Sequence, residues 1–147
     1  MTEVNAPKIL IVEDDIHAHE LYRNAFDSVG FDVTICSDAD GFFAEHVDEL
    51  KPDIISMDLM IGKGGRPAER DGFEAIRLLK ADLRTADIPI IVLSSFFQEE
   101  HVKHAKELGA VDYISTSGYE IQKIPMKFLE YLKNPAHYRP LHPVFYA

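Results

Sequence analysis

Short polar groups follow four of the most apolar segments of the chain, and every residue in these groups carries a carboxyl or hydroxyl side chain. In chain order these groups are Glu13-Asp14-Asp15, Asp58, Ser94-Ser95 and Ser115-Thr116-Ser117. Carboxylates gathered at one place repel one another unless a proton or a cation neutralises them. Mg²⁺ suits this task because it binds carboxylate, carbonyl and water oxygens in an octahedron. A carboxylate beside Mg²⁺ can attack phosphorus and form an aspartyl phosphate, so the pattern indicates phosphoryl chemistry.

The same acids have a plainer explanation as solvated helix caps. Asp is common at the position between a strand and a helix, where its side chain accepts from free backbone N–H groups. Capping is a sufficient explanation for any one of these acids. A shared site is favoured by their combination, because acids follow two of the segments and a hydroxyl, Ser94, follows a third. In such a site the metal neutralises phosphoryl oxygens, and the Ser94 hydroxyl donates to another.

The apolar segments have the pattern of strands in a parallel sheet. They are 8–12, 31–35, 53–57, 88–93 and 111–114. Three are nearly continuous and β-branched, as in strands buried on both faces, and the second and fifth alternate as strands near an edge do. Segments with helical spacing follow them, at 16–29, 40–50, 71–83, 98–108 and 125–132. This alternation predicts an α/β fold whose ligands bind beyond the carboxyl ends of the strands.

Length and charge narrow the function classes. A chain of 147 residues predicts one domain. Its formal net charge of −10 argues against nucleic-acid binding and against attraction to anionic membranes, both of which need a basic face. The N-terminus lacks the pattern of a signal peptide, and no apolar run approaches a membrane span. The single cysteine, Cys36, forms no intramolecular disulfide, so we expect a cytoplasmic protein.

With these features the sequence resembles the receiver domains of two-component response regulators, over about residues 7–133. The resemblance rests on the motifs at 9–15, 53–60, 71–74, 89–95 and 108–113. It implies a flavodoxin-like, doubly wound (βα)₅ sandwich with a five-stranded parallel sheet of order 2-1-3-4-5. We expect a flexible N-terminus at 1–6, the receiver at 7–133 and a C-terminal tail at 134–147. The tail could fold back on the domain, bridge a dimer or remain disordered.

The resemblance also implies a role for each acid. Asp58 would accept a phosphoryl group from a histidine kinase or phosphotransfer protein. Asp14 and Asp58 would bind Mg²⁺ directly, Glu13 would reach it through a water, and the backbone carbonyl of Met60 would be a further ligand. Ser94 would move toward the phosphate, and the aromatic ring of Tyr113 would respond to that movement.

The sequence departs from the family pattern at the end of the fifth strand. Thr116 stands where the family places a lysine whose cation is aimed at the phosphoryl group. Threonine donates one neutral hydrogen bond and supplies no charge, which weakens the interaction. Lys63 or Lys123 could substitute from nearby loops, although each fits better as a solvated surface lysine.

The loop after Asp58 is the second departure. Residues 61–70 make it about six residues longer than in the family. Its Gly-Lys-Gly-Gly sequence lacks the Ser or Thr that follows the lysine of a phosphate-binding loop. We expect a flexible basic insert whose cations, Lys63, Arg66 and Arg70, partly offset the missing lysine.

These features predict a stand-alone receiver that is not an enzyme and acts by docking on a downstream protein, with a homodimer possible. The alternative is a pseudo-receiver, a protein-interaction module that works without phosphorylation, because Thr116 departs from the pattern. A third class, an Mg²⁺-dependent phosphohydrolase, is disfavoured. Met60 stands where such enzymes usually carry a second aspartate.

Overall fold

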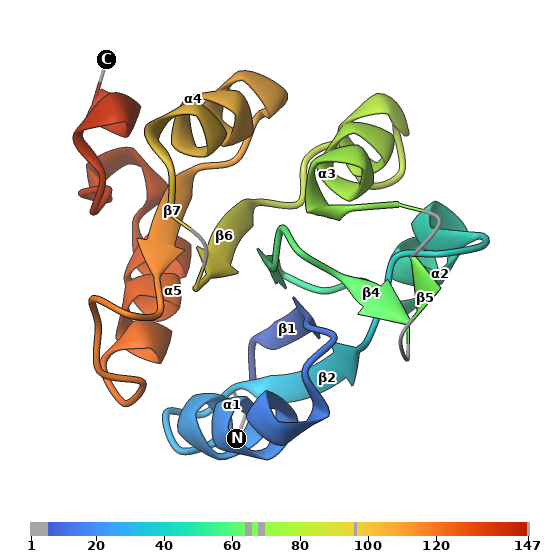
Figure 1. The fold of residues 1–147 in the computed structure, drawn as a ribbon. Coiled ribbons are helices and arrows are strands. Elements are labelled where there is room, and N and C mark those ends of the chain that lie inside the picture. The colour runs from blue at the N-terminus through green and yellow to red at the C-terminus, as the bar shows by residue number, and fades with distance from the viewer. Residues whose placement is uncertain (1–5, 64–65, 68–69, 96, 147) are drawn as a thin grey trace.

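Five parallel strands form the central layer of the molecule (Figure 1). The computed structural model describes residues 6–63, 66–67, 70–95 and 97–146, with the backbone alone at 62–63 and 66–67. The strands are β1 (Lys8–Val12), β2 (Asp32–Cys36), β3 (Ile54–Met57), β6 (Ile90–Ser94) and β7 (Asp112–Ser115). They lie in the order β2-β1-β3-β6-β7. This is the predicted order 2-1-3-4-5, because β6 and β7 are the fourth and fifth strands of this sheet in chain order.

The strand register brings the acidic groups to one edge of the sheet. The last residue of β1, Val12, pairs with the last residue of β3, Met57. Glu13 and Asp58 follow these paired residues. On the other side of β3, Met57 pairs with Val92 of β6. The carboxyl ends of β1, β3 and β6 therefore meet, as the sequence predicts.

Helices cover both faces of the sheet. They are α1 (Ile16–Asp27), α2 (Phe43–Leu50), α3 (Gly72–Ala81), α4 (Glu99–Leu108) and α5 (Ile124–Lys133). Alternate residues of a strand point to opposite faces. Ile9 and Ile11 accordingly pack in the cluster with α1 and α5, and Leu10 and Val12 pack in the cluster with α2, α3 and α4. Burial on both faces is the reason for the continuous apolar runs.

A short hairpin occupies part of the long loop after Asp58, where the sequence predicts a flexible insert. β4 (Gly62–Lys63) and β5 (Arg66–Pro67) pair antiparallel, with Lys63 opposite Arg66. Ile61, just before the hairpin, is 7% exposed and packs in the core. This buried anchor gives the insert a fixed start that the loop composition does not reveal.

The described part of the C-terminal tail folds back on the domain. Two 3₁₀ helices, η1 (Pro135–His137) and η2 (Pro143–Tyr146), lie beside α4 and α5 along the edge strand β7 (Figure 1). Leu141 packs against the apolar cluster on one side of the sheet, and Val144 packs against the cluster on the other side. The tail thus straddles the edge of the sheet.

A buried carboxylate holds the tail in place. Asp112 is fully buried and accepts hydrogen bonds from the Tyr138 hydroxyl at 2.5 Å and from the Leu141 backbone N–H at 2.9 Å. The Tyr113 backbone N–H also donates to it, at 2.8 Å. A buried charge needs several such partners, and the tail supplies most of them.

Candidate functional site

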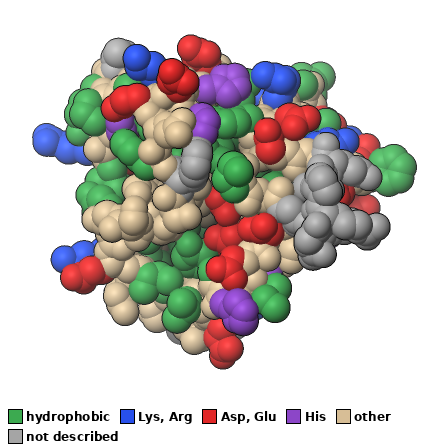
Figure 2. Space-filling model, in the orientation of Figure 1, with side chains coloured by type: hydrophobic (Ala, Val, Ile, Leu, Met, Phe, Trp, Pro, Cys, Tyr) green, Lys and Arg blue, Asp and Glu red, His purple; other side chains and the backbone are tan. Residues whose placement is uncertain are grey.

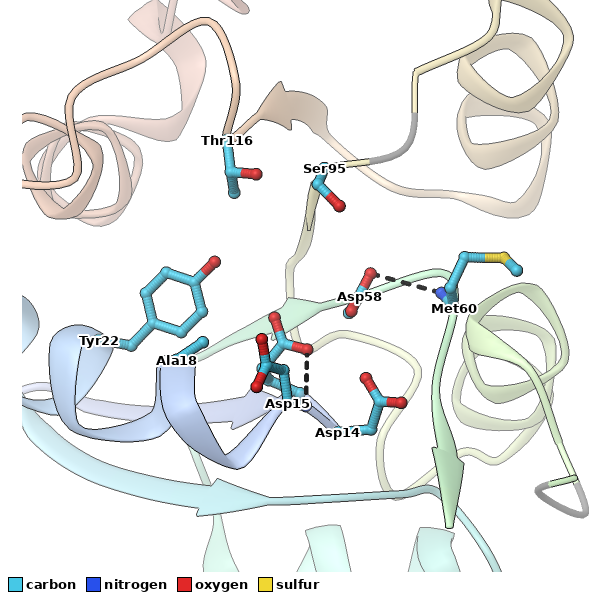
Figure 3. Close-up of a pocket in the computed structure, with 9 residues that line it drawn as sticks. Asp14, Asp15, Ala18, Tyr22, Asp58, Met60, Ser95 and Thr116 are labelled. Atoms are coloured by element: carbon cyan, nitrogen blue, oxygen red, sulfur yellow. Dashed lines mark hydrogen bonds between the residues drawn. The ribbon is translucent and has the colours of Figure 1, made fainter. Parts of the chain in front are cut away.

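Three carboxylates lie together where β1 and β3 end. Each of Glu13, Asp14 and Asp58 places one oxygen within 4.8 Å of the others. They line a cavity of about 270 Å³ at this edge of the sheet (Figure 3). The full lining consists of Glu13, Asp14, Asp15, Ala18, Tyr22, Asp58, Met60, Ser95 and Thr116. On the face drawn in Figure 2, acidic side chains gather in this region.

The two most buried acids interact directly. Glu13 is 8% exposed and Asp58 is 9% exposed. Burial, followed by the hydrogen bond and the charge of Asp58, raises the pKa of Glu13 far above its ordinary value. Burial also raises the pKa of Asp58, although hydrogen bonds from Glu13, Ser94 and the Met60 backbone oppose that effect. Without a cation, the Glu13–Asp58 pair therefore retains a proton at neutral pH.

The donor set fits a hard divalent cation. Carboxylate oxygens from two strand ends converge, and Met60 lines the same cavity. Its backbone N–H donates to Asp58 Oδ1 at 3.3 Å. Mg²⁺ prefers a few carboxylates together with carbonyl oxygen and water. The predicted ligand residues Glu13, Asp14, Asp58 and Met60 are thus brought to one place.

A close helix approach fixes the loop that carries Asp58. The Gly72 N–H at the start of α3 donates to the Leu59 carbonyl at 3.0 Å. A Cβ atom on Gly72 would lie 2.3 Å from the Asp58 carbonyl oxygen and 2.6 Å from the Leu59 Cα. Only glycine fits this contact. Asp71 then caps α3 through a reciprocal pair of hydrogen bonds with Glu74, which holds the helix start in place.

The predicted hydroxyl and aromatic residues lie behind the cavity. Ser94 is 2% exposed, and its hydroxyl is hydrogen-bonded to Asp58 and to Tyr113. Tyr113 is also 2% exposed, and the ring of Phe97 packs edge-on against it at 5.9 Å. Ser95, and not Ser94, faces the cavity. Ser94 therefore connects the acidic cluster to Tyr113.

The end of β7 supplies a hydroxyl and no cation. Thr116 lines the cavity, and its backbone N–H donates to the Ser94 carbonyl at 3.1 Å. Within the described parts of the chain, no lining residue is Lys or Arg. In Figure 2 the coloured Lys and Arg side chains lie away from the acidic cluster.

Two of the cations suggested as substitutes lie elsewhere. The Lys123 side chain is 71% exposed and pairs with Glu120 at 3.9 Å, which fits the expected solvated surface lysine rather than a substitute for the missing one. The Arg70 guanidinium donates to the carbonyls of Ala39 and Gly41, at 2.8 and 2.9 Å. Arg70 does not line the cavity, and its predicted share in offsetting the missing lysine stays a prediction. The side chains of Lys63 and Arg66 fall outside the described residues.

Tyr22 belongs to the site, although the sequence patterns do not place it there. It occupies a core position of α1 and is 6% exposed, but its hydroxyl points into the cavity (Figure 3). Burial, followed by the negative charges of Glu13 and Asp58, raises its pKa. The one signal in the sequence is its residue type, because a buried tyrosine usually places its hydroxyl against a polar group. His19 of α1 also reaches this region and lies 2.5 Å from the Glu13 carbonyl oxygen.

A family model for the response regulator receiver domain matches residues 9–120, so the chain belongs to the response regulator receiver family. This family belongs to two-component signalling systems, and its members share the fold of a signalling domain, not that of a catalytic family. Among the helices of the described part of the chain, none is long and apolar enough to cross a bilayer.

Curated relatives are longer proteins. The chain is 33% identical over 118 residues to the DNA-binding dual master transcriptional regulator RpaA of Synechocystis, covering 80% of this chain and 46% of RpaA. It is 34% identical over 109 residues to the phosphate regulon transcriptional regulatory protein PhoB of Pseudomonas aeruginosa, covering 73% of this chain and 44% of PhoB. The chain thus spans less than half the length of these relatives.

Solved structures share the fold. The phosphorylated cyanobacterial phytochrome response regulator RcpA superposes with a TM-score of 0.70 at 25% identity, covering 89% of this chain and 96% of that one. The BeF₃-activated receiver domain of RstA from Klebsiella pneumoniae gives a TM-score of 0.69 at 25% identity, covering 83% of this chain and 96% of that one.

Proposed function

We propose that Asp58 accepts a phosphoryl group from a histidine kinase or a phosphotransfer protein, and that this changes binding to a downstream protein. The observation that supports this most is the convergence of Glu13, Asp14 and Asp58 within 4.8 Å at the carboxyl edge of the sheet. Asp58 is in contact with Glu13, with Ser94 and with the Met60 N–H.

Asp14 and Asp58 would hold Mg²⁺ directly, with Glu13 through a water and the Met60 carbonyl as a further ligand. Held by these residues, Mg²⁺ would neutralise the oxygens of the transferring phosphoryl group. A carboxylate oxygen of Asp58 attacks phosphorus. The new O–P bond forms as the P–N bond of the phosphohistidine donor breaks, and the electron pair leaves with the imidazole.

Ser94 and Tyr113 would transmit the new charge. The Ser94 hydroxyl, which already contacts Asp58, would donate to a phosphoryl oxygen. Tyr113, hydrogen-bonded to Ser94, would then repack with Phe97, which starts the segment leading into α4. This gives a buried two-state element that the added charge can bias.

A pseudo-receiver is the second candidate, and one observation favours it. The cavity carries Thr116 where a cation is expected, and no Lys or Arg of the described chain lines it. Such a module would bind its partner without phosphorylation. Stand-alone action, homodimer formation and a cytoplasmic location remain predictions.

Intact mass after incubation with phosphoramidate and Mg²⁺ separates the two candidates. A receiver gains the mass of one phosphoryl group, and chelating Mg²⁺ prevents the gain. Asp58→Asn should gain no mass. Asp112→Asn is the control, because Asp112 is also buried but lies outside the cavity. The absence of any mass gain with phosphoramidate or acetyl phosphate would favour the pseudo-receiver.

A further inference from the structure

The cavity has an acidic side and a hydroxyl side. Glu13, Asp14 and Asp58 form the acidic side, and Tyr22 and Thr116 supply hydroxyls from α1 and from the end of β7 (Figure 3). A phosphoryl group on Asp58 would extend into the space between the two sides. Its oxygens would then need donors in addition to the metal.

Tyr22 is held rigidly enough to be such a donor. Its ring belongs to the apolar cluster between the sheet and helices α1 and α5, and only 6% of the residue is exposed. Packing of the ring fixes the direction of the hydroxyl, which faces the cavity (Figure 3). A donor that is already oriented loses little entropy when an anion arrives.

The Tyr22 hydroxyl is also protonated and available. Its burial and the nearby charges of Glu13 and Asp58 raise its pKa, so it keeps its proton at neutral pH. Among the residues that the structure describes, no hydrogen bond engages this hydroxyl. Because it opens into the cavity, it can donate to an anion bound there, and a bond to a charged acceptor is stronger than one to a neutral group.

We propose that Tyr22 binds the phosphoryl group on Asp58, donating a hydrogen bond from α1, with Thr116 as a second neutral donor on the same side. This inference rests on the proposed function. It assigns to Tyr22 and Thr116 the phosphoryl-binding role that a lysine would have at position 116. Tyr22 contacts the phosphoryl group only after transfer begins, so it stabilises the phosphorylated state and leaves Mg²⁺ binding to the acids unchanged.

Beryllium trifluoride, a noncovalent mimic of a phosphoryl group, tests the proposal through its affinity for the Mg²⁺-loaded protein. Tyr22→Phe keeps the ring and removes the donor. We expect its affinity for the mimic to fall about ten-fold, as for loss of a hydrogen bond to a charged group. The lifetime of the phosphorylated protein should fall in parallel, with Mg²⁺ affinity and thermal unfolding unchanged.

Tyr146→Phe is the matched control, because Tyr146 is 65% exposed on η2, outside the cavity. Thr116→Val is a second variant that removes the other hydroxyl at nearly constant volume, and it should weaken binding of the mimic in the same direction. If Tyr22→Phe binds the mimic and retains phosphate as Tyr146→Phe does, the proposal is wrong while the proposed function stands. If the unmodified protein neither binds the mimic nor gains a phosphoryl group, both fail.

Discussion

A Cβ atom on Gly72 would lie 2.3 Å from the carbonyl oxygen of Asp58. The start of α3 therefore rests directly on the backbone that carries the proposed acceptor. Gly72→Ala should lower the free energy of unfolding by about 1–3 kcal/mol, because the added methyl group forces backbone atoms apart. Urea unfolding measures the loss.

Gly118→Ala is the control for this substitution. A Cβ atom there meets its nearest neighbour at 3.9 Å, which is ordinary van der Waals contact. Equal stability of the Gly72→Ala and Gly118→Ala variants would contradict the close packing of α3 on the acceptor loop.

Stability of the metal-free protein should fall as pH rises. Burial, followed by contact with Asp58, raises the pKa of Glu13 from 4.5 to about 9. Between these values the native state holds a proton that the unfolded state has lost, so the free energy of unfolding decreases with pH. Thermal unfolding without Mg²⁺ at about pH 5 and about pH 8 measures this, with Glu13→Gln as the variant in which the effect becomes smaller.

Mg²⁺ should stabilise the protein more at the higher pH. Binding of the cation requires the proton of the Glu13–Asp58 pair to leave, so the apparent affinity rises with pH. The increase in the midpoint of thermal unfolding on adding Mg²⁺ should therefore be larger at about pH 8 than at about pH 5. The same increase at both pH values would show that the pair does not share a proton.

Much of this site follows from the sequence. The apolar runs at β1 and β3 predict parallel strands, and parallel strands end at one edge, so the order of residues alone brings Glu13, Asp14 and Asp58 together.

Gly72 and Tyr22 are harder to predict. Gly72 belongs to a recognised Asp-Gly motif, but its contact with Asp58 depends on the angle at which α3 meets the sheet. Tyr22 fits a helical apolar pattern, which places its ring in the core and does not show where its hydroxyl points.

The sequence leaves the docking of the tail open, as one of three alternatives, for a related reason. Asp112 alternates with apolar residues in a short strand, a pattern typical of a strand with one solvated face. In the structure Asp112 is fully buried, and it accepts hydrogen bonds from N–H and O–H groups of the tail that lies over it. Asp112 and Tyr138 lie 26 residues apart in the sequence, so neither residue by itself predicts the contact.

Tyr138→Phe tests the docking of the tail. It removes the donor to Asp112 and keeps the ring, so we expect a loss of about 1.5–3 kcal/mol in the free energy of unfolding, as for a hydrogen bond to a charged group. Faster hydrogen exchange at the Leu141 amide, which donates to the same carboxylate, should accompany it. The tail would not depend on Asp112 if Tyr138→Phe behaved as Tyr146→Phe does in both measurements.

Thr116→Lys tests the charge balance of the cavity. An ammonium group at this position would face Glu13 and Asp58 and favour their charged forms. The metal-free protein should gain a few degrees in the midpoint of thermal unfolding, and added Mg²⁺ should stabilise it less. Ser117→Lys adds the same charge next to the cavity without lining it. If both lysine variants unfold at the same temperature, Thr116 does not control the charge of the site.

The position of the phosphoryl group is the most direct test of Asp58 as the acceptor. After phosphoramidate treatment with Mg²⁺, borohydride reduction converts an acyl phosphate on aspartate into homoserine, which peptide mass spectrometry locates. We predict homoserine at residue 58 alone, and none in Asp58→Asn or without Mg²⁺. Homoserine at any other acid, or at none, would contradict the assignment of Asp58 as the phospho-acceptor.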